Sequence, residues 1–119
     1  MAYTAIDDSG LFMNTVLYTG TGSTQAVTGV GFQPDMTWVK SRSNTAAHKL
    51  TDAVRGVTKE LEPNSTAAEY TEVNGLTVFG ADGFTIGSDP AYGGSGRTFA
   101  GWNWKAGTTT GITTDGNTT

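Results

Sequence analysis

The chain offers few residues that could carry nucleophilic or acid–base catalysis. It has a single histidine, His48, and no cysteine, and no serine lies in the G-x-S-x-G pattern of a nucleophile elbow. A general base must lie within hydrogen-bond reach of the proton it removes, and a lone histidine beside Lys49 is more typical of a surface or hydrogen-bonded structural residue. The same composition excludes disulfides and the ligand set of a zinc site.

Carboxylates are the remaining candidates for chemistry. Pairs of carboxylates can hydrolyse glycosides, and the chain has three such pairs: Asp7–Asp8, Glu60/Glu62 and Glu69/Glu72. All three lie in polar stretches that predict exposure, whereas a general acid needs an apolar pocket to raise its pKa. Aspartates at predicted turns could bind calcium, but no EF-hand spacing is present and such residues commonly serve the turn itself. The sequence predicts a protein that is not an enzyme, with no cofactor and no metal site.

Aromatic and basic side chains give a stronger signal, and it points to binding. Trp102 and Trp104 alternate with Asn103 and Lys105, so both indoles lie on one face of a strand. They could form a stacking platform for sugars or fill half of a sandwich core, and the core is the commoner outcome because a buried indole removes a large area from water. The segment PAYGGSGR is predicted to be an exposed, flexible loop. The candidate binding residues are Tyr92, Arg97, Trp102 and Trp104.

The stretch GFQPDMTWVKSRS, residues 31–43, contains a short basic run in an acidic protein. After a turn at Pro34–Asp35, a period of two puts Met36, Trp38, Lys40 and Arg42 on one side of a strand. We expect Trp38 to anchor the core and the basic end to leave it. The other residues expected to be architectural are Phe32, Phe79 and Phe84, together with Asp52 and Arg55 as an ion pair or a hydrogen-bonded turn before Gly56.

Strand-like segments recur about every ten residues, which is typical of an antiparallel sandwich. The expected strands are 14–19, 24–32, 36–43, 47–56, 57–61, 76–79, 84–86 and 98–107, with hairpin loops at 20–23 and 81–83. Residues 64–74 could hold one helical turn or form a long loop. We therefore predict an all-β, antiparallel β-sandwich (jelly-roll or lectin-like) of seven or eight short strands, with a β-barrel as the nearest alternative. Residues 1–13 are an arm or edge segment, 14–106 the sandwich, and 107–119 a flexible Gly/Thr-rich linker or tail.

Composition agrees with this fold class and excludes some partners. Glycine occurs 17 times and threonine is commoner still, which favours strands and tight turns. The net charge of −4 argues against non-specific binding to nucleic acid or anionic membranes. No apolar run approaches the ~20 residues needed to cross a bilayer, and MAYTAIDDSG lacks the features of a secretory signal.

Several segments together resemble a domain of tailed-phage virion proteins of the kind common in marine phages, described as tail fibre or tail appendage proteins. They follow in the same order from about Tyr3 to Gly107: LYTGTGSTQAVTGVGFQPDMTWVKSRS, LTDAVRGVTKEL, NSTAAE, LTVFGADGFTIGSD and WNWKAG. The resemblance implies a lectin-like β-sandwich built into a virion appendage. No catalytic residues come with it.

From this resemblance we expect a non-enzymatic virion module, in a tail fibre, appendage or capsid decoration, that acts in assembly. Its partners would be other virion proteins and copies of itself, with a homotrimer as the expected oligomer. Such a virion component is assembled in the host cytoplasm and released by lysis. The alternative is a receptor-recognition module that binds host-surface glycan. A third hypothesis is a hydrolase that acts on the host envelope, and only the carboxylates that are predicted to be exposed favour it.

Overall fold

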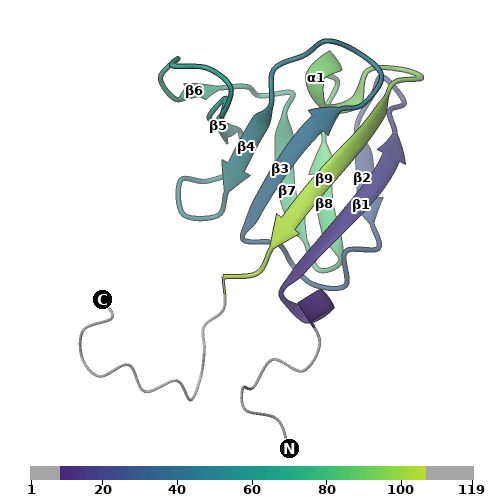
Figure 1. The fold of residues 1–119 in the computed structure, drawn as a ribbon, viewed down its shortest axis with the longest axis vertical. Helices are drawn as coiled ribbons and strands as arrows, with labels where there is room; N and C mark the ends of the chain where they lie inside the picture. The colour runs from purple at the N-terminus through teal and green to yellow at the C-terminus, as the bar shows by residue number, and fades with distance from the viewer. Residues whose placement is uncertain (1–8, 107–119) are drawn as a thin grey trace, which may run out of the picture.

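The computed structural model describes residues 9–106 and shows an all-β sandwich of antiparallel sheets (Figure 1). The larger sheet has the order β1 (Met13–Thr19), β9 (Thr98–Trp104), β3 (Met36–Ser41), β4 (Lys49–Asp52). The second sheet has the order β2 (Gln25–Thr28), β8 (Gly83–Ile86), β7 (Leu76–Gly80). A third, small sheet pairs β5 (Lys59–Glu60) with β6 (Tyr70–Thr71). The predicted sandwich is confirmed; the predicted tail at 107–119, and residues 1–8 of the predicted arm, lie outside the described residues.

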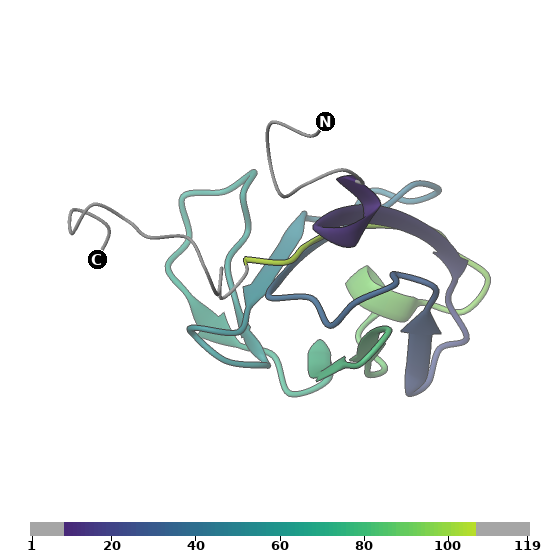
Figure 2. The same cartoon turned by 90° about the horizontal axis from the view of Figure 1, so that it is seen from below.

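The core lies between the two larger sheets, which are seen stacked in Figure 2. Both sheets contribute to one cluster of buried residues: Val27, Val39, Leu76, Phe84, Ile86, Tyr92 and Phe99. Tyr18 stacks on Phe99 with ring centroids 5.1 Å apart and meets Phe84 edge-on at 6.1 Å. The architectural roles predicted for three phenylalanines are confirmed, since Phe32 and Phe84 are buried and Phe79 packs against the cluster.

Two short helical elements complete the described residues. A 3-10 turn, η1 (Ser9–Leu11), precedes β1, and α1 (Pro90–Gly93) lies at one end of the sandwich (Figure 1). Neither is long and apolar enough to span a membrane, and they are the only helices within residues 9–106. Asp89 caps α1, because its carboxylate accepts a hydrogen bond from the backbone N–H of Ala91 at 2.7 Å. The prediction of a flexible loop over PAYGGSGR is therefore wrong at its first half.

Residues 20–23 do not form the predicted hairpin loop. They carry the chain from one sheet to the other, because β1 pairs with β9 while β2 pairs with β8. The connection is held by backbone bonds from Gly20 to Arg97 and from Gly22 to Gly93, both at 2.8 Å. A segment rich in Gly and Ser can form either a hairpin loop or a connection between two sheets. The choice depends on pairing with β8 and β9, which lie far along the chain.

The strand predicted at 24–32 ends at Thr28. Val27 is buried while Ala26 and Thr28 are exposed. Gly29 and Gly31 have φ values of +94° and +89°, which glycine adopts without the strain of a side chain. These turns interrupt the period of two and bring Val30 into the interior.

Two more expectations are corrected in the middle of the chain. The strand predicted at 47–56 ends at Asp52, where the Asp52–Arg55 turn begins. Arg55 donates its backbone N–H to Asp52 Oδ1 at 2.8 Å and its Nε to Oδ2 at 2.6 Å, which confirms the predicted pair. The segment 64–74 forms no helical turn and instead supplies β6, a strand that the sequence reading missed.

Gly83 is a position where only hydrogen fits. A Cβ there would lie 1.9 Å from the carbonyl oxygen of Val27 on the neighbouring strand. We expect Gly83→Ala to lower the free energy of unfolding by about 1–3 kcal/mol, measured by urea denaturation, because the strands must separate to admit the methyl group. Gly80→Ala is the matched control in the same hairpin, since the nearest atom to its Cβ would be 3.7 Å away. Equal stability of the two variants would contradict this account.

Candidate functional site: an aromatic face with a basic end

The outer face of the larger sheet carries the residues that sequence reasoning assigned to the core. Along β3, Thr37, Val39 and Ser41 are buried, whereas Met36, Trp38 and Lys40 are only half-buried. The prediction that Trp38 anchors the core is therefore wrong, although its predicted grouping with Met36 and Lys40 is correct.

Trp38 faces Trp102 directly across the β3–β9 ladder, with ring centroids 6.4 Å apart in an edge-to-face arrangement. Trp104 lies two residues further along β9, on the same side, and all three indoles are half-buried. The inward positions of β9 hold Phe99, Gly101 and Asn103 instead. Asn103 is 0% exposed and accepts a hydrogen bond from Thr37 Oγ1 at 2.8 Å. Of the two positions considered for the tryptophan pair, the structure has the outer face of the sheet and not the core; sugar stacking on this face stays a prediction.

His48 completes a cavity of about 280 Å³ whose lining is Trp38, His48, Trp102 and Trp104. Trp38 Nε1 donates to His48 Nδ1 at 3.3 Å, which confirms the prediction of a hydrogen-bonded histidine. Because an indole N–H can only donate, Nδ1 must be the accepting nitrogen, and neutral His48 carries its hydrogen on Nε2. The cavity thus combines three aromatic walls with one polar edge.

A second hollow of about 450 Å³ adjoins the first, because His48 lines both. Apart from Ala46, its remaining lining is polar or basic: Lys40, Ser41, Arg42, Ser43, Asn44, Thr45 and Asn64. No carboxylate belongs to that lining, in a chain whose net charge is −4. The aromatic face therefore has a basic end, formed by Lys40 and Arg42. Lys40 lies on the same side of β3 as Trp38, as the period of two predicts.

The other two candidate binding residues lie elsewhere. Tyr92 is 1% exposed, so the prediction that it meets a ligand is wrong; α1 turns its ring into the core. Arg97 is partly exposed, and its Nη1 donates to the carbonyl of Pro90 at 3.3 Å. Neither residue lines the aromatic cavity, and a binding role for Arg97 stays a prediction.

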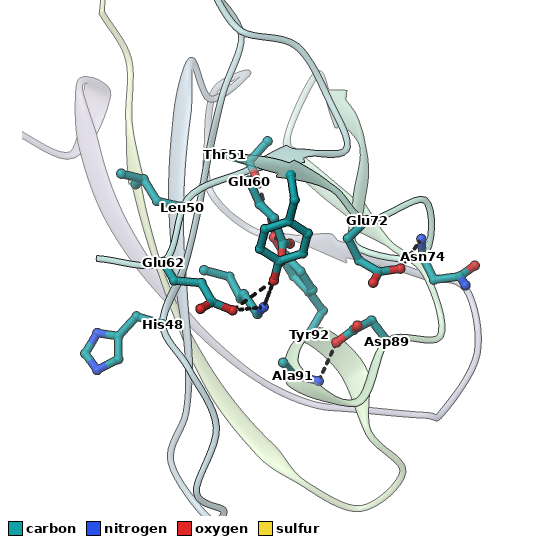
Figure 3. A network of polar contacts seen from close by, with 12 residues as sticks. His48, Leu50, Thr51, Glu60, Glu62, Glu72, Asn74, Asp89, Ala91 and Tyr92 are labelled. Carbon is teal, nitrogen blue, oxygen red and sulfur yellow. Dashed lines mark hydrogen bonds and ion pairs between the residues drawn. The ribbon is translucent and has the colours of Figure 1, made fainter. Parts of the chain in front are cut away.

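A buried polar network lies where β4 meets the small β5–β6 sheet (Figure 3). Lys49 Nζ is 2.7 Å from Glu60 Oε1 and 2.8 Å from Glu62 Oε1, and it also donates to the Tyr70 hydroxyl. Glu60 is 1% exposed, which contradicts the expected exposure of this carboxylate pair. Its second oxygen, Oε2, accepts the Tyr92 hydroxyl at 2.6 Å. The network joins β4, β5, β6 and α1, and so ties the small sheet to the sandwich.

Hydrogen bonds and burial shift the pKa values of two groups in the network. Burial acts to lower the pKa of Lys49, but the hydrogen bonds from its ammonium to Glu60, Glu62 and Tyr70 outweigh it and raise the pKa above the usual range. Burial raises the pKa of the Tyr92 hydroxyl, and its bond to Glu60 raises it further. Both groups therefore keep their protons near neutral pH, and Lys49 carries a positive charge.

Glu62 makes stability depend on pH. Its hydrogen bonds from Lys49 and Tyr70 lower its pKa below the usual 4.5. The folded state therefore binds this proton less readily than the unfolded state, so the stabilisation is present above about pH 4.5 and is lost as pH falls through the lowered value. We expect Glu62→Gln to flatten the acid limb of a stability–pH curve measured by urea denaturation. An acid limb as steep in Glu62→Gln as in the wild type would count against this assignment.

The turn aspartates that sequence analysis considered for calcium have structural partners. The Asp82 carboxylate accepts the backbone N–H groups of Gly29 at 3.0 Å and Gly31 at 2.7 Å, and Asp89 caps α1. Within residues 9–106 no group of three His, Asp or Glu side chains could hold a metal ion. The carboxylates of Asp82 and Asp89 therefore stabilise local backbone structure by accepting backbone N–H groups.

No curated protein and no solved structure matches this chain. A family match covers residues 8–119, nearly the whole chain. The match brings no assigned activity, ligand or partner, so function has to be argued from the site. The chain belongs to the family described as Domain of unknown function (DUF7483).

Proposed function

We propose that this protein is a non-enzymatic binding module that holds a saccharide on the outer face of its larger sheet. The observation that carries the proposal is the cavity formed by three tryptophans and His48 on a solvent-facing sheet surface. A half-buried indole keeps part of its apolar surface in contact with water, and a ligand that covers that surface gains the free energy of its burial. A cluster of such indoles on an outer face is therefore typical of a binding surface.

The chemistry of this face suits a sugar ring. A pyranose has an apolar face of C–H groups that packs on an aromatic ring, and hydroxyl groups at its rim that need hydrogen-bond partners. The indoles supply the aromatic surfaces, while His48 Nε2–H can donate a hydrogen bond at the edge of the cavity. Sites of this kind combine apolar walls with a few placed polar groups.

A glycan and bacterial-polysaccharide array tests this proposal. The folded domain is displayed multivalently, because avidity raises the effective affinity of one weak site. We expect saturable binding to a restricted set of polysaccharides. A blank array with correctly folded protein would contradict the saccharide proposal.

A second candidate, supported by the resemblance to phage virion proteins, is assembly in a virion appendage. We propose as its contact surface the β1 edge of the same face, where Leu17 is 62% exposed and β1 is the edge strand. Its partners would be copies of the chain, as in a trimer, or neighbouring virion proteins.

The assembly candidate makes its own prediction. If copies associate through this edge, light scattering at high concentration should give a mass above that of the monomer, and Leu17→Lys should return the mass to that of the monomer. Val54→Lys, at a fully exposed turn, is the control and should leave the oligomer intact. A wild-type monomer at high concentration would count against self-association.

A further inference from the structure

We infer that the saccharide is acidic, and that its anionic group is held in the hollow lined by Lys40 and Arg42. This inference rests on the proposed function and names the ligand class for the same site. A carboxylate or a sulfate ester on the sugar would supply the charge. The basic hollow adjoins the aromatic cavity, so one ligand can occupy both.

The geometry of β3 places Trp38 and Lys40, one of the two cations, on the same side of the strand. Arg42 follows, with its backbone N–H bonded to the Thr98 carbonyl at 2.7 Å. Successive outward residues on a strand lie about 7 Å apart, twice the rise per residue. His48 forms the shared wall of the two hollows. A sugar stacked on Trp38 would therefore present a neighbouring substituent to Lys40.

The charges of the basic hollow have no acidic counterpart in its lining. Lys40 Nζ donates to the carbonyl oxygens of Ser41 at 2.5 Å and Asn44 at 3.4 Å, which fix its position without neutralising it. Arg42 is exposed, and no ion pair joins it within the described residues. By contrast, Arg55 is paired with both Asp52 and Glu69. In an acidic protein, two unneutralised cations beside an aromatic cavity favour an anionic ligand.

The end of β3 and the turn after it, which carry Lys40 and Arg42, are held in place before any ligand arrives. Ser41 Oγ accepts the Asn44 backbone N–H at 3.1 Å, and Ser43 Oγ accepts that of Thr98 at 3.0 Å. Across the hollow, Asn64 Oδ1 accepts the backbone N–H of His48 at 2.9 Å. Such preorganisation lowers the entropy lost on binding. A guanidinium can then hold a carboxylate or sulfate through two parallel hydrogen bonds.

Binding of matched acidic and neutral ligands tests the inference. The probes are an oligouronate, the same oligosaccharide with its carboxyl groups reduced to alcohols, and a sulfated derivative of the reduced form. We expect the double variant Lys40→Gln/Arg42→Gln to bind the acidic probes at least about tenfold more weakly than the wild type, since it removes two charge-assisted contacts. Lys59→Gln, a loss of positive charge in β5 outside both hollows, should bind as the wild type does. Raising the salt concentration should weaken wild-type binding of the acidic probes only.

The outcomes show whether the inference fails alone or together with the proposed function. Preferential binding of an acidic probe, lost in the double variant, supports both, and the two acidic probes decide between carboxylate and sulfate. Equal binding of the acidic and reduced probes would overturn the inference and leave the saccharide site standing. Binding of no probe by folded protein would overturn both.

Discussion

Replacing Glu60 by alanine is expected to lower the free energy of unfolding by about 3–5 kcal/mol, a large part of the roughly 5–15 kcal/mol that a domain possesses. The variant leaves the Lys49 ammonium without its most buried partner and the Tyr92 hydroxyl without its acceptor. Glu62, whose side chain is 19% exposed, stays as a partner of Lys49 but does not replace the buried carboxylate, and removing one partner of a buried pair costs far more than the pair itself contributes. Urea denaturation followed by circular dichroism measures the effect.

Two further variants separate the ion pair from general packing. Tyr92→Phe removes one hydrogen bond to Glu60 and should cost about 1–3 kcal/mol. Lys49→Met/Glu60→Leu replaces both charges with apolar groups of similar size and should be more stable than Glu60→Ala, because no unpaired charge stays in the Glu60 site. Wild-type stability of Glu60→Ala would show that the network does not tie the small sheet to the sandwich.

Replacing Trp102 by alanine is expected to reduce saccharide binding by at least about tenfold, which corresponds to 1.4 kcal/mol. Trp102 lies between Trp38 across the ladder and Trp104 along its own strand, so its loss opens the middle of the aromatic cavity. Isothermal titration calorimetry with a polysaccharide fragment selected on the array measures the change. The variant should stay folded, because the inward face of β9 is unchanged.

Val78→Ala is the matched control for this prediction. Val78 is a half-exposed apolar residue on β7, in the opposite sheet, and its truncation should leave binding intact. Similar binding by Trp102→Ala and the wild type would exclude the aromatic cavity as the binding site.

The sequence predicts the strands and their faces better than it predicts which face is inside. The period of two correctly groups Trp38 with Lys40, and Trp102 with Trp104. Hydrophobicity then predicts the wrong face of these strands as buried. The inward positions at this end of the sheet hold Thr37 and Asn103, which are joined by a hydrogen bond. That pairing depends on the register between β3 and β9, and the two residues are far apart in the chain.

The buried network was missed for a related reason. Glu60 and Glu62 read as exposed because they lie in polar sequence, and burial of a carboxylate depends on partners from other segments. Lys49 is 11 residues before Glu60, and Tyr92 is 32 residues after it. The signal that could have indicated a shared ion pair is the two-residue spacing of Glu60, at the end of β5, and Glu62, just beyond it, with a lysine on β4 nearby.

The most direct test of the account is the response of the three indole N–H signals in a ¹H–¹⁵N spectrum during titration with an oligosaccharide. Every tryptophan of the chain lines the proposed site, so these signals report on that face alone. The account predicts that all three shift saturably, together with the backbone signals of Lys40 and His48. Ligand-induced shifts that gather on β7 and β8, with the three indole signals unchanged, would contradict it.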